Sequence, residues 1–173
     1  MFASLALRCQ DSGDTSAGYG RAVKVRVETQ LPISPALAWE TVLKPETLQF
    51  ITRGVLGFRP TGEIPATLEQ GMTLEVRLLF FHVLPAWRHE IHVVRLDHRA
   101  RQIQTEEHGG PVRGWMHLIE INPLADPGRC RYSDEIEIHA RPLTPLVWLY
   151  AQLFYRYRQR RWQKLARSVA PAT

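Results

Sequence analysis

Four ionisable side chains lie at strand-like positions in the second half of the chain, among apolar neighbours. They are His89, Glu107, His117 and Asp134. Each lies an even number of residues from an isoleucine on its own strand, so that when the isoleucines face a core these side chains face it too. A charged group in an apolar interior must be paired or change its pKa, and such clusters are common at functional sites. The sequence therefore predicts four polar groups on the inner face of one sheet.

Three interpretations of this cluster are compatible with the sequence. In the first, His89 or His117 acts as general acid or base on a carbonyl-bearing apolar ligand, oriented by a neighbouring carboxylate. That carboxylate is Asp134 or Glu107. In the second, the four groups only form hydrogen bonds with the polar end of a ligand. In the third, they pair with one another and fix the register of the strands. The catalytic candidates are thus the four residues of the cluster.

No metal or cofactor motif accompanies these residues. The segment His89-Glu90-Ile91-His92 is one residue shorter than the zinc motif HExxH, and on a strand its two histidines face opposite sides. The chain has no Gly-x-Ser-x-Gly motif, and Gly109-Gly110-Pro111 is typical of a turn between strands rather than a phosphate-binding loop. We expect neither a metal nor a cofactor.

Aromatic and aliphatic side chains at related positions favour a ligand cavity around the cluster. For any single aromatic residue, filling the core is the alternative. The predicted ligand-binding residues are Trp87, His89, Ile91, Thr105, Glu107, Trp115, His117, Tyr132, Asp134, Tyr150, Leu153, Phe154 and Tyr157.

The elements that must position these residues follow from hydrophobic periodicity. Alternation from Ala22 to Leu31 predicts a first strand, and Ser34-Pro35 predicts the start of a short helix over 36–43. Lys44-Pro45 breaks this helix, and a second begins at Glu46. Turn-rich segments then separate six strands, which favours an antiparallel meander. These strands are predicted at 57–60, 72–83, 87–96, 102–107, 114–121 and 131–139.

One long helix follows, and Thr144-Pro145 marks its start. Apolar residues recur at helical spacing along one stripe of its first half, which we expect to pack on the sheet. They are Leu146, Leu149, Tyr150, Leu153 and Tyr157. Basic residues continue the same stripe, and we expect them to reach an edge or a cavity mouth. They are Arg156, Arg160, Lys164 and Arg167.

Two surface features have more than one interpretation. The basic half of the helix contacts an anionic membrane surface, or pairs with a ligand carboxylate, or is a solvated helix end whose cations complement the helix dipole. The apolar turn from His82 to Pro85 is a gate, a membrane-touching edge or a packed loop.

The order of these elements, with several short motifs, resembles the START-like (SRPBCC) superfamily, which includes polyketide cyclase and lipid-transport proteins and the birch-pollen-allergen type. The motifs are Pro32-Ile33-Ser34-Pro35 with Trp39, Trp87-Arg88-His89, residues 105–111, Trp115-Met116-His117 and Tyr132-Ser133-Asp134. The resemblance covers residues 22–168. It implies an α+β helix-grip fold, in which a curved, seven-stranded antiparallel sheet wraps around the C-terminal helix, with a hydrophobic-ligand cavity between them. Members include cyclases, hydrolases, lipid carriers and sensors, so the fold alone selects no reaction.

Composition is that of one globular domain: 173 residues, 45% hydrophobic and 23% charged. We expect a flexible leader over 1–20, the domain over 21–169 and a tail over 170–173. The net charge of +5 is concentrated after Pro142, so no nucleic-acid-binding face is expected. No apolar run approaches the roughly 18 residues of a membrane span. The distant cysteines Cys9 and Cys130 and the lack of a signal sequence favour a cytoplasmic protein.

We therefore expect a protein that binds or transports a hydrophobic small molecule or lipid in an internal cavity. The alternative is a cyclase or dehydratase that uses cavity histidine and aspartate residues as acid and base on a carbonyl-containing hydrophobic substrate. A third class is a regulatory module that relays ligand occupancy to a partner.

Overall fold

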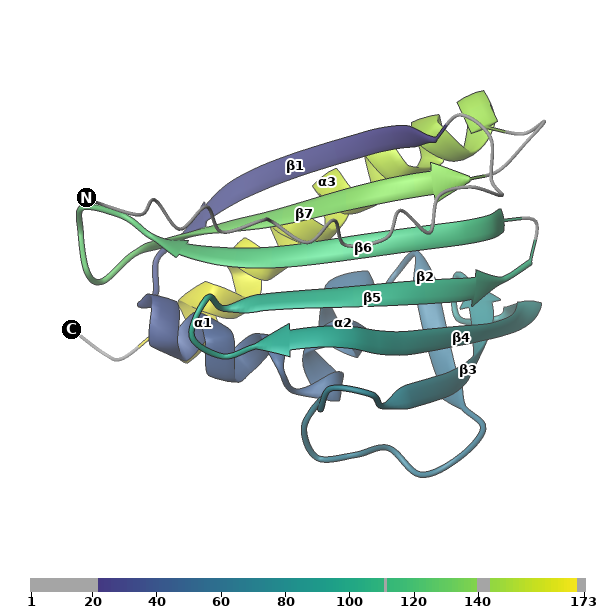
Figure 1. Ribbon diagram of the computed structural model, residues 1–173, viewed down its shortest axis with the longest axis horizontal. Coiled ribbons are helices and arrows are strands. Elements are labelled where there is room, and N and C mark those ends of the chain that lie inside the picture. Colours follow the sequence, from purple (N-terminus) through teal and green to yellow (C-terminus); the bar gives the residue numbers. More distant parts are fainter. Residues whose placement is uncertain (1–21, 111, 140–143, 171–173) are drawn as a thin grey trace, which may run out of the picture.

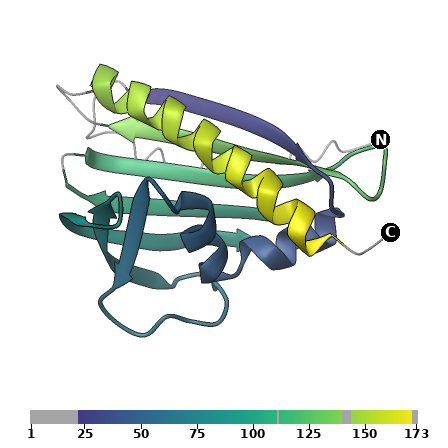
Figure 2. The same ribbon diagram turned by 180° about the vertical axis from the view of Figure 1, so that it is seen from behind.

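One antiparallel sheet curves around a long helix (Figures 1 and 2). The computed structural model describes residues 22–110, 112–139 and 144–170. The strands are β1 (Val23–Leu31), β2 (Leu56–Pro60), β3 (Thr73–Phe80), β4 (Leu84–Asp97), β5 (Gln102–Gly109), β6 (Val112–Pro123) and β7 (Cys130–His139). The helices are α1 (Pro35–Val42), α2 (Pro45–Thr52) and α3 (Thr144–Val169). The predicted α+β helix-grip architecture is confirmed.

The strand order is β1-β7-β6-β5-β4-β3-β2, a meander from β2 to β7 with β1 added beside β7. All neighbouring strands run antiparallel. Short connections favour this from β3 to β7, whereas β1 pairs with β7 from the far end of the sequence. Two short helices and α3 cover the concave face, which Figure 2 shows from the helix side. The inner face of the sheet and α3 together enclose the core.

Local sequence explains where the two short helices begin. The Ser34 hydroxyl accepts a hydrogen bond from the backbone N–H of Leu37 at 3.3 Å, and Pro35 occupies the first helical position. Lys44 has extended backbone angles ahead of Pro45, which separates α1 from α2. The helix start and the break agree with the sequence prediction. Helix α2 lies beside α3 on the concave face, where the Arg161 guanidinium donates hydrogen bonds to the backbone carbonyl of Phe50.

The strand alternation agrees with the predicted inward positions. Thr105 pairs with His117 across β5 and β6, and Ile119 pairs with Asp134 across β6 and β7. The isoleucines of these strands are buried in the core, so the polar members of the same alternation point to the same side. His92, by contrast, lies on the other side of β4, where its Nδ1 is 2.9 Å from the hydroxyl of Thr73.

The orientation of α3 differs from the prediction. Leu146, Leu149 and Leu153 were expected against the sheet, but they are 66%, 50% and 64% exposed. The buried face of α3 consists of Ala151, Phe154, Tyr155, Arg158, Gln159, Trp162 and Ala166.

Charge explains this orientation. Burying the leucine stripe would bury the basic residues that continue it, and those have no carboxylate partners along the helix. The observed face carries one cation, Arg158, which meets the buried carboxylate of Asp134. It also offers large aromatic side chains to the core. Along its whole length, α3 can therefore pack on the sheet only through the face that carries Arg158 and the aromatic side chains.

The β3–β4 turn lies earlier than predicted. Strand β3 ends at Phe80 rather than residue 83, because Phe81 and His82 both have positive φ, of 51° and 64°. Strand β4 then begins at Leu84. Phe81, Val83 and Leu84 are 63%, 72% and 57% exposed, so this segment is not an ordinary packed loop.

Some predicted features lie outside the described residues, namely the leader over 1–20 with Cys9, Pro142, and most of the tail. Cys130 is a free, buried thiol in the core. None of the helices in the described part of the chain is both long enough and apolar enough to cross a membrane.

Candidate functional site

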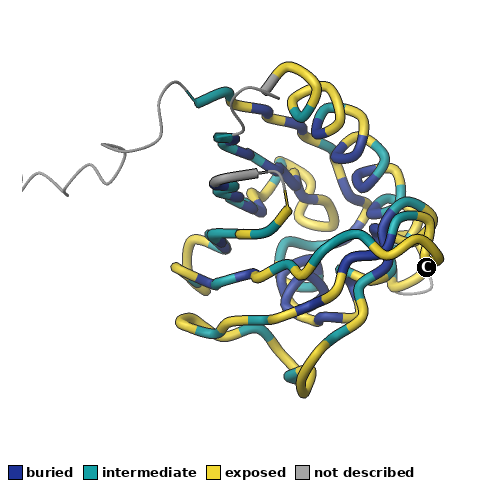
Figure 3. The backbone as a smooth tube through the Cα atoms, turned by 90° about the vertical axis from the view of Figure 1, so that its right-hand side faces the viewer, coloured by how far each residue is buried: buried dark blue, intermediate teal, exposed yellow. Residues whose placement is uncertain are grey.

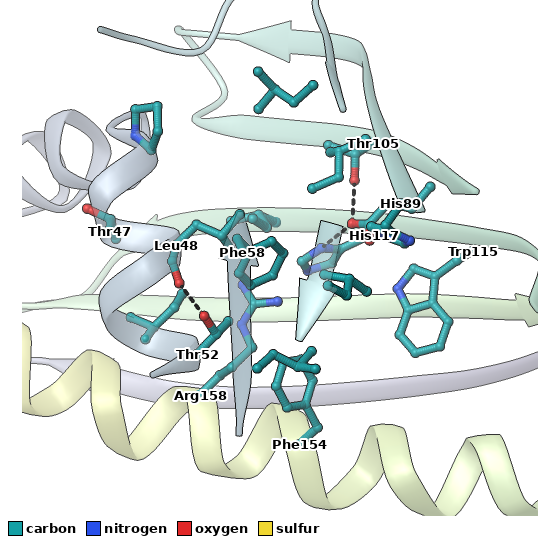
Figure 4. Close-up of a pocket in the computed structure, with 18 of the residues that line it drawn as sticks. Thr47, Leu48, Thr52, Phe58, His89, Thr105, Trp115, His117, Phe154 and Arg158 are labelled. Carbon is teal, nitrogen blue, oxygen red and sulfur yellow. Dashed lines mark hydrogen bonds and ion pairs between the residues drawn. The ribbon is translucent and has the colours of Figure 1, made fainter. Parts of the chain in front are cut away.

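A cavity of about 160 Å³ lies between the inner face of the sheet, α2 and α3 (Figure 4). Its walls are mostly apolar: α2 contributes Leu48 and Ile51, the strands contribute leucines, isoleucines and aromatic rings, and α3 contributes Phe154 and Tyr155. At one end the walls become polar, with His89, Glu107, His117, Thr105 and Arg158. The cavity therefore combines an apolar body with one hydrogen-bonding end.

Nine of the thirteen predicted ligand-binding residues line this cavity. They are Trp87, His89, Ile91, Thr105, Glu107, Trp115, His117, Tyr150 and Phe154. The other four lie elsewhere. Tyr132 and Asp134 are completely buried behind the cavity wall, Leu153 faces outward from α3, and the hydroxyl of Tyr157 donates a hydrogen bond to the backbone carbonyl of Arg53. The alternation of the strands thus predicted most of the residues that line the cavity. Of the apolar stripe predicted on α3, only Tyr150 lines it.

The four polar groups predicted from the strands form one connected chain. His89 Nε2 is 2.9 Å from Glu107 Oε2, and the hydroxyl of Thr105 donates to Glu107 Oε1 at 3.2 Å. His117 Nδ1 is 3.6 Å from Glu107 Oε1. On its other side, His117 Nε2 is 2.9 Å from Asp134 Oδ1. The imidazole of His117 therefore lies between two carboxylates.

Two further groups complete the chain at Asp134. The hydroxyl of Tyr132 donates to Asp134 Oδ1 at 2.9 Å, and the guanidinium of Arg158 approaches the same oxygen to 3.8 Å. Arg158 also lies over the ring of Tyr155, at 4.7 Å from its centroid. Its side chain is only 5% exposed. Arg158 is thus a buried cation at the polar end of the cavity, reaching it from α3 (Figure 4).

Burial and pairing act in opposite directions on these groups. Desolvation disfavours the charged form of Asp134, but Arg158 and His117 outweigh it and lower the pKa of this carboxyl. Desolvation is likewise outweighed at Glu107, whose pKa is lowered by hydrogen bonds from His117 and His89. At His117 desolvation opposes the charge, yet the bonds to Asp134 and Glu107 raise the pKa. Pairing therefore favours the ionised forms of Asp134, Glu107 and His117.

Sequence reasoning missed Arg158. It is one of the basic residues after Pro142, but its helical position differs from that of Arg156, Arg160, Lys164 and Arg167. A usable signal was present: Phe154 and Tyr155 precede it by four and three residues, and Trp162 follows it by four. An arginine flanked by aromatic residues at these spacings lies on their face of the helix.

His89 is the histidine that the cavity can use. Its Nε2 is engaged by Glu107, while its Nδ1 is buried and has no hydrogen-bond partner among the described residues. A carboxylate on one ring nitrogen favours the N–H there and leaves the other nitrogen as an acceptor. His117, in contrast, has carboxylates at both nitrogens. The two histidines therefore differ in what they offer a ligand.

A second hollow of about 380 Å³ adjoins the cavity on the side of α2. It lies between α2, the strands β2 and β3, and residues 60–64. The walls that it shares with the first cavity are Pro45, Leu48, Phe58, Leu74 and Ile91. A molecule longer than the inner cavity has room to extend in this direction.

The fold is START-like, and solved structures with very different sequences share it. A START superfamily protein from Mycobacterium smegmatis aligns with a TM-score of 0.66 and 13% identity, over 84% of this chain and 98% of that one. Norcoclaurine synthase from Thalictrum flavum, solved with dopamine and hydroxybenzaldehyde, aligns with a TM-score of 0.65 and 16% identity, over 98% and 100%. A protein from Chromobacterium violaceum gives 0.67 and 15% identity, over 86% and 98%.

Within this fold the family can be stated more narrowly. The chain belongs to the family described as "Domain of unknown function (DUF8410)", whose model matches residues 29–167. No curated protein matches it in sequence.

Proposed function

We propose that this protein binds a hydrophobic small molecule or lipid in the cavity between sheet and α3. The observation that carries the proposal is the combination of apolar walls with one buried hydrogen-bonding end, the usual composition of a small-molecule site. The apolar walls provide affinity, and the polar end orients the ligand. The solved structures support the fold alone, so the ligand class is argued from the residues of the cavity.

The size of the cavity limits what its inner part can hold. An apolar protein cavity of roughly 150 Å³ accepts a benzene-sized molecule, and the inner cavity here is about 160 Å³. It therefore suits one ring or a short, branched chain. A carrier of longer molecules would use the adjoining hollow beside α2 for the remainder.

The charges at the polar end favour a neutral ligand. Two carboxylates, Glu107 and Asp134, are matched by two cations, Arg158 and the imidazolium of His117. At this end an added carboxylate would find no unmatched positive charge and would lose its hydration, since the other cation of the lining, Lys44, is an exposed residue next to α2. A carbonyl or hydroxyl oxygen carries no such cost. We therefore infer a ligand with one uncharged polar group.

This proposal includes a membrane contact and a cellular location. Arg156, Arg160, Lys164 and Arg167 are all exposed on α3, where they are accessible to an anionic membrane surface. A ligand that is a lipid would be exchanged there. We place the protein in the cytoplasm because Cys130 is a free thiol.

A native mass spectrum, compared with the denatured mass, tests whether the cavity is occupied. We expect a discrete noncovalent adduct that is absent after denaturation. Binding of a neutral fluorescent probe, phenylnaphthylamine, tests the cavity together with the adjoining hollow, because its three rings need both. Leu78→Trp places an indole inside the cavity and should abolish probe binding, whereas Val94→Trp, on the outer face of β4, should not. The absence of both adduct and probe binding would exclude the proposal.

A charged analogue of the probe tests the preference for a neutral ligand. Anilinonaphthalene sulfonate has nearly the same aromatic body as the neutral probe but carries a negative charge. We expect it to bind at least tenfold more weakly, because more than about 1.4 kcal/mol of hydration is lost without a free cation to replace it. Equal or tighter binding of the sulfonate would show that the polar end accepts anions.

The second candidate function is an acid–base enzyme, and the state of His89 favours it. Its Nδ1 has no partner in the described part of the chain, and Glu107 holds the other nitrogen, which is the arrangement of a general base. Such a base would remove a proton next to the carbonyl of a bound ketone. Incubation of aryl ketones in heavy water should then show deuterium exchange at that carbon. Exchange should fall in Glu107→Gln, and its absence in the parent protein would leave binding alone.

A further inference from the structure

The outward stripe of α3 changes in character along its length. Its first half carries Leu146, Leu149 and Leu153, which are 66%, 50% and 64% exposed. Its second half carries four exposed cations, Arg156, Arg160, Lys164 and Arg167. Successive members are three or four residues apart, so they follow one side of the helix. Figure 3 shows that α3 is exposed on the side that faces away from the sheet and buried on the side that faces it.

No negative charge balances these cations. The sequence of α3 contains no Asp or Glu. Within the described residues, no ion pair joins any of the four cations to a carboxylate. The stripe therefore joins an exposed apolar segment directly to a segment of unbalanced positive charge.

The β3–β4 turn is a second exposed apolar element. Phe81 and His82 both have positive φ, a conformation that costs energy in bulky residues and is adopted most readily by Asn-Gly. The turn nevertheless presents the phenyl ring of Phe81 to the surface, followed by Val83 and Leu84. Folding stability does not explain an exposed aromatic side chain at a strained position.

The turn and α3 both contact the connection between α2 and β2. His82 Nε2 accepts a hydrogen bond from the backbone N–H of Gly54 at 2.9 Å, and the hydroxyl of Tyr157 on α3 donates to the carbonyl of Arg53. Figures 1 and 2 place the start of α3 and the β3–β4 turn at the same end of the molecule. We call the two elements together the docking face.

We propose that the docking face binds the surface of a bilayer that contains anionic lipids. Leucines and the turn side chains enter the boundary between headgroups and acyl chains, while the basic half of α3 lies on the lipid phosphates. A second copy of this chain fits less well, since it offers no matching row of carboxylates on this face. The inference extends the membrane contact of the proposed function, and it stands whether or not the cavity is occupied.

Docking would bring the bilayer next to the cavity wall. Tyr150 lines the cavity and is 37% exposed, on the turn of α3 that also carries Leu149 and Leu153. A molecule that leaves the bilayer at this point would meet the cavity without crossing much water.

Co-sedimentation of the full chain with vesicles tests the docking face. One set of vesicles is phosphatidylcholine, and the other is an equal mixture of phosphatidylcholine and phosphatidylglycerol. We expect binding to the mixed vesicles only, weakened by salt. Leu149→Glu/Leu153→Glu should weaken it at least tenfold. Arg156→Gln/Arg160→Gln should weaken it about 25-fold, at the usual contribution of a cation near an anionic surface.

Matched controls carry the same changes elsewhere. Val94→Glu places an acid on the outer face of β4, and Arg99→Gln/Arg129→Gln removes two exposed charges from the turns at the other end of the sheet. Both should bind as the parent does. Equal sedimentation with the two vesicle types, no sedimentation, or unchanged binding by the docking-face variants would overturn the proposal. Dimers in sedimentation velocity that dissociate in Leu149→Glu/Leu153→Glu, without vesicle binding, would assign the face to a second copy instead.

A failure of docking is distinguishable from a failure of the cavity. The probe phenylnaphthylamine reports on the cavity in the same preparations without vesicles. We expect its affinity to change less than twofold in both docking-face variants. Loss of vesicle binding with retained probe binding therefore identifies the surface, and not the cavity, as the altered part.

Discussion

Toward the sheet, α3 presents Phe154, Tyr155, Arg158 and Trp162, while away from it the same helix presents three leucines followed by four cations. The charged residue Arg158 is inside, and the leucines are in water. The inner face is decided by partners, because the Arg158 guanidinium finds Asp134 and an aromatic ring. The outer face has no partner within the described residues. Hydrophobicity alone therefore does not select the buried side of this helix; the availability of a countercharge does.

The strongest test of this comparison replaces the buried cation. Arg158→Met keeps much of the side-chain volume but leaves the two buried carboxylates, Glu107 and Asp134, with His117 as their single matching cation. Loss of one partner of a buried ion pair typically costs about 3–5 kcal/mol. We expect a loss of this size in the free energy of unfolding measured with urea. Arg160→Met, two residues away on the outer face, should change it by less than about 0.5 kcal/mol. Equal losses in the two variants would contradict the assignment of faces. Arg158→Met/Asp134→Asn should recover part of the loss.

A pair of adjacent apolar residues gives the next largest contrast. Phe154 is 8% exposed and Leu153 is 64% exposed. Truncation of a buried phenylalanine to alanine costs about 3 kcal/mol or more through lost burial and the cavity left behind. Leu153→Ala should cost less than about 0.5 kcal/mol, since its side chain is already in water. Thermal unfolding of both variants measures the difference, and a larger loss for Leu153→Ala would restore the orientation expected from the sequence.

The ionised cluster on the inner side predicts a pH dependence. The pKa values of Glu107 and Asp134 are lowered, so their stabilisation is complete above the ordinary value of 4.5 for Glu and 3.8 for Asp and is lost as pH falls through the folded values. The pKa of His117 is raised, so its stabilisation is complete below 6.5 and is lost as pH rises through the folded value. The cluster should stabilise the fold most between pH 4.5 and 6.5.

Urea unfolding across this range measures the effect. In His117→Gln the decline above pH 6.5 should disappear. His108→Gln, at an exposed position on β5, should keep it. If the free energy of unfolding of His117→Gln still declines above pH 6.5, another group causes that decline.

The smallest predicted effect concerns the strained turn of the docking face. Phe81→Asn replaces an exposed aromatic residue by one that tolerates positive φ, and should raise the free energy of unfolding by about 0.5 kcal/mol. The same change should weaken vesicle binding. Val83→Asn, next to the turn but outside the strained pair, serves as the control and should not stabilise. A stabilised Phe81→Asn with unchanged vesicle binding would remove the turn from the docking face.

The strands, the site residues on them and the position of α3 in the chain could be predicted, but the buried side of α3 could not. Alternation in β4 to β7 requires His89, Glu107, His117 and Asp134 to share the isoleucine side, and a strand has only two sides to choose between. The ends of β3 and β4 were placed less well, because Phe81 and His82 are not typical residues of a turn with positive φ.

Arg158 shows why the helical part of the site was missed. A helix presents a continuous range of faces, and two apolar stripes competed in α3. Choosing between them required knowledge that a carboxylate on β7 faces the fifteenth residue of α3. That contact joins Asp134 and Arg158 across the core, and the sequence pattern around either residue does not predict it.

By itself, the sequence determined the order of elements, the breaks at Ser34-Pro35 and Lys44-Pro45, and the side of each strand, because these depend on neighbours within a few residues. Only the tertiary structure decided which side of α3 is buried, that His117 lies between two carboxylates, and that Tyr132 and Asp134 lie behind the cavity wall. These features depend on countercharges and side-chain volumes brought together from distant parts of the chain. Burial of the leucine side would also bury the four cations that continue it without carboxylate partners on α3, and that cost outweighs the gain from burying three leucines.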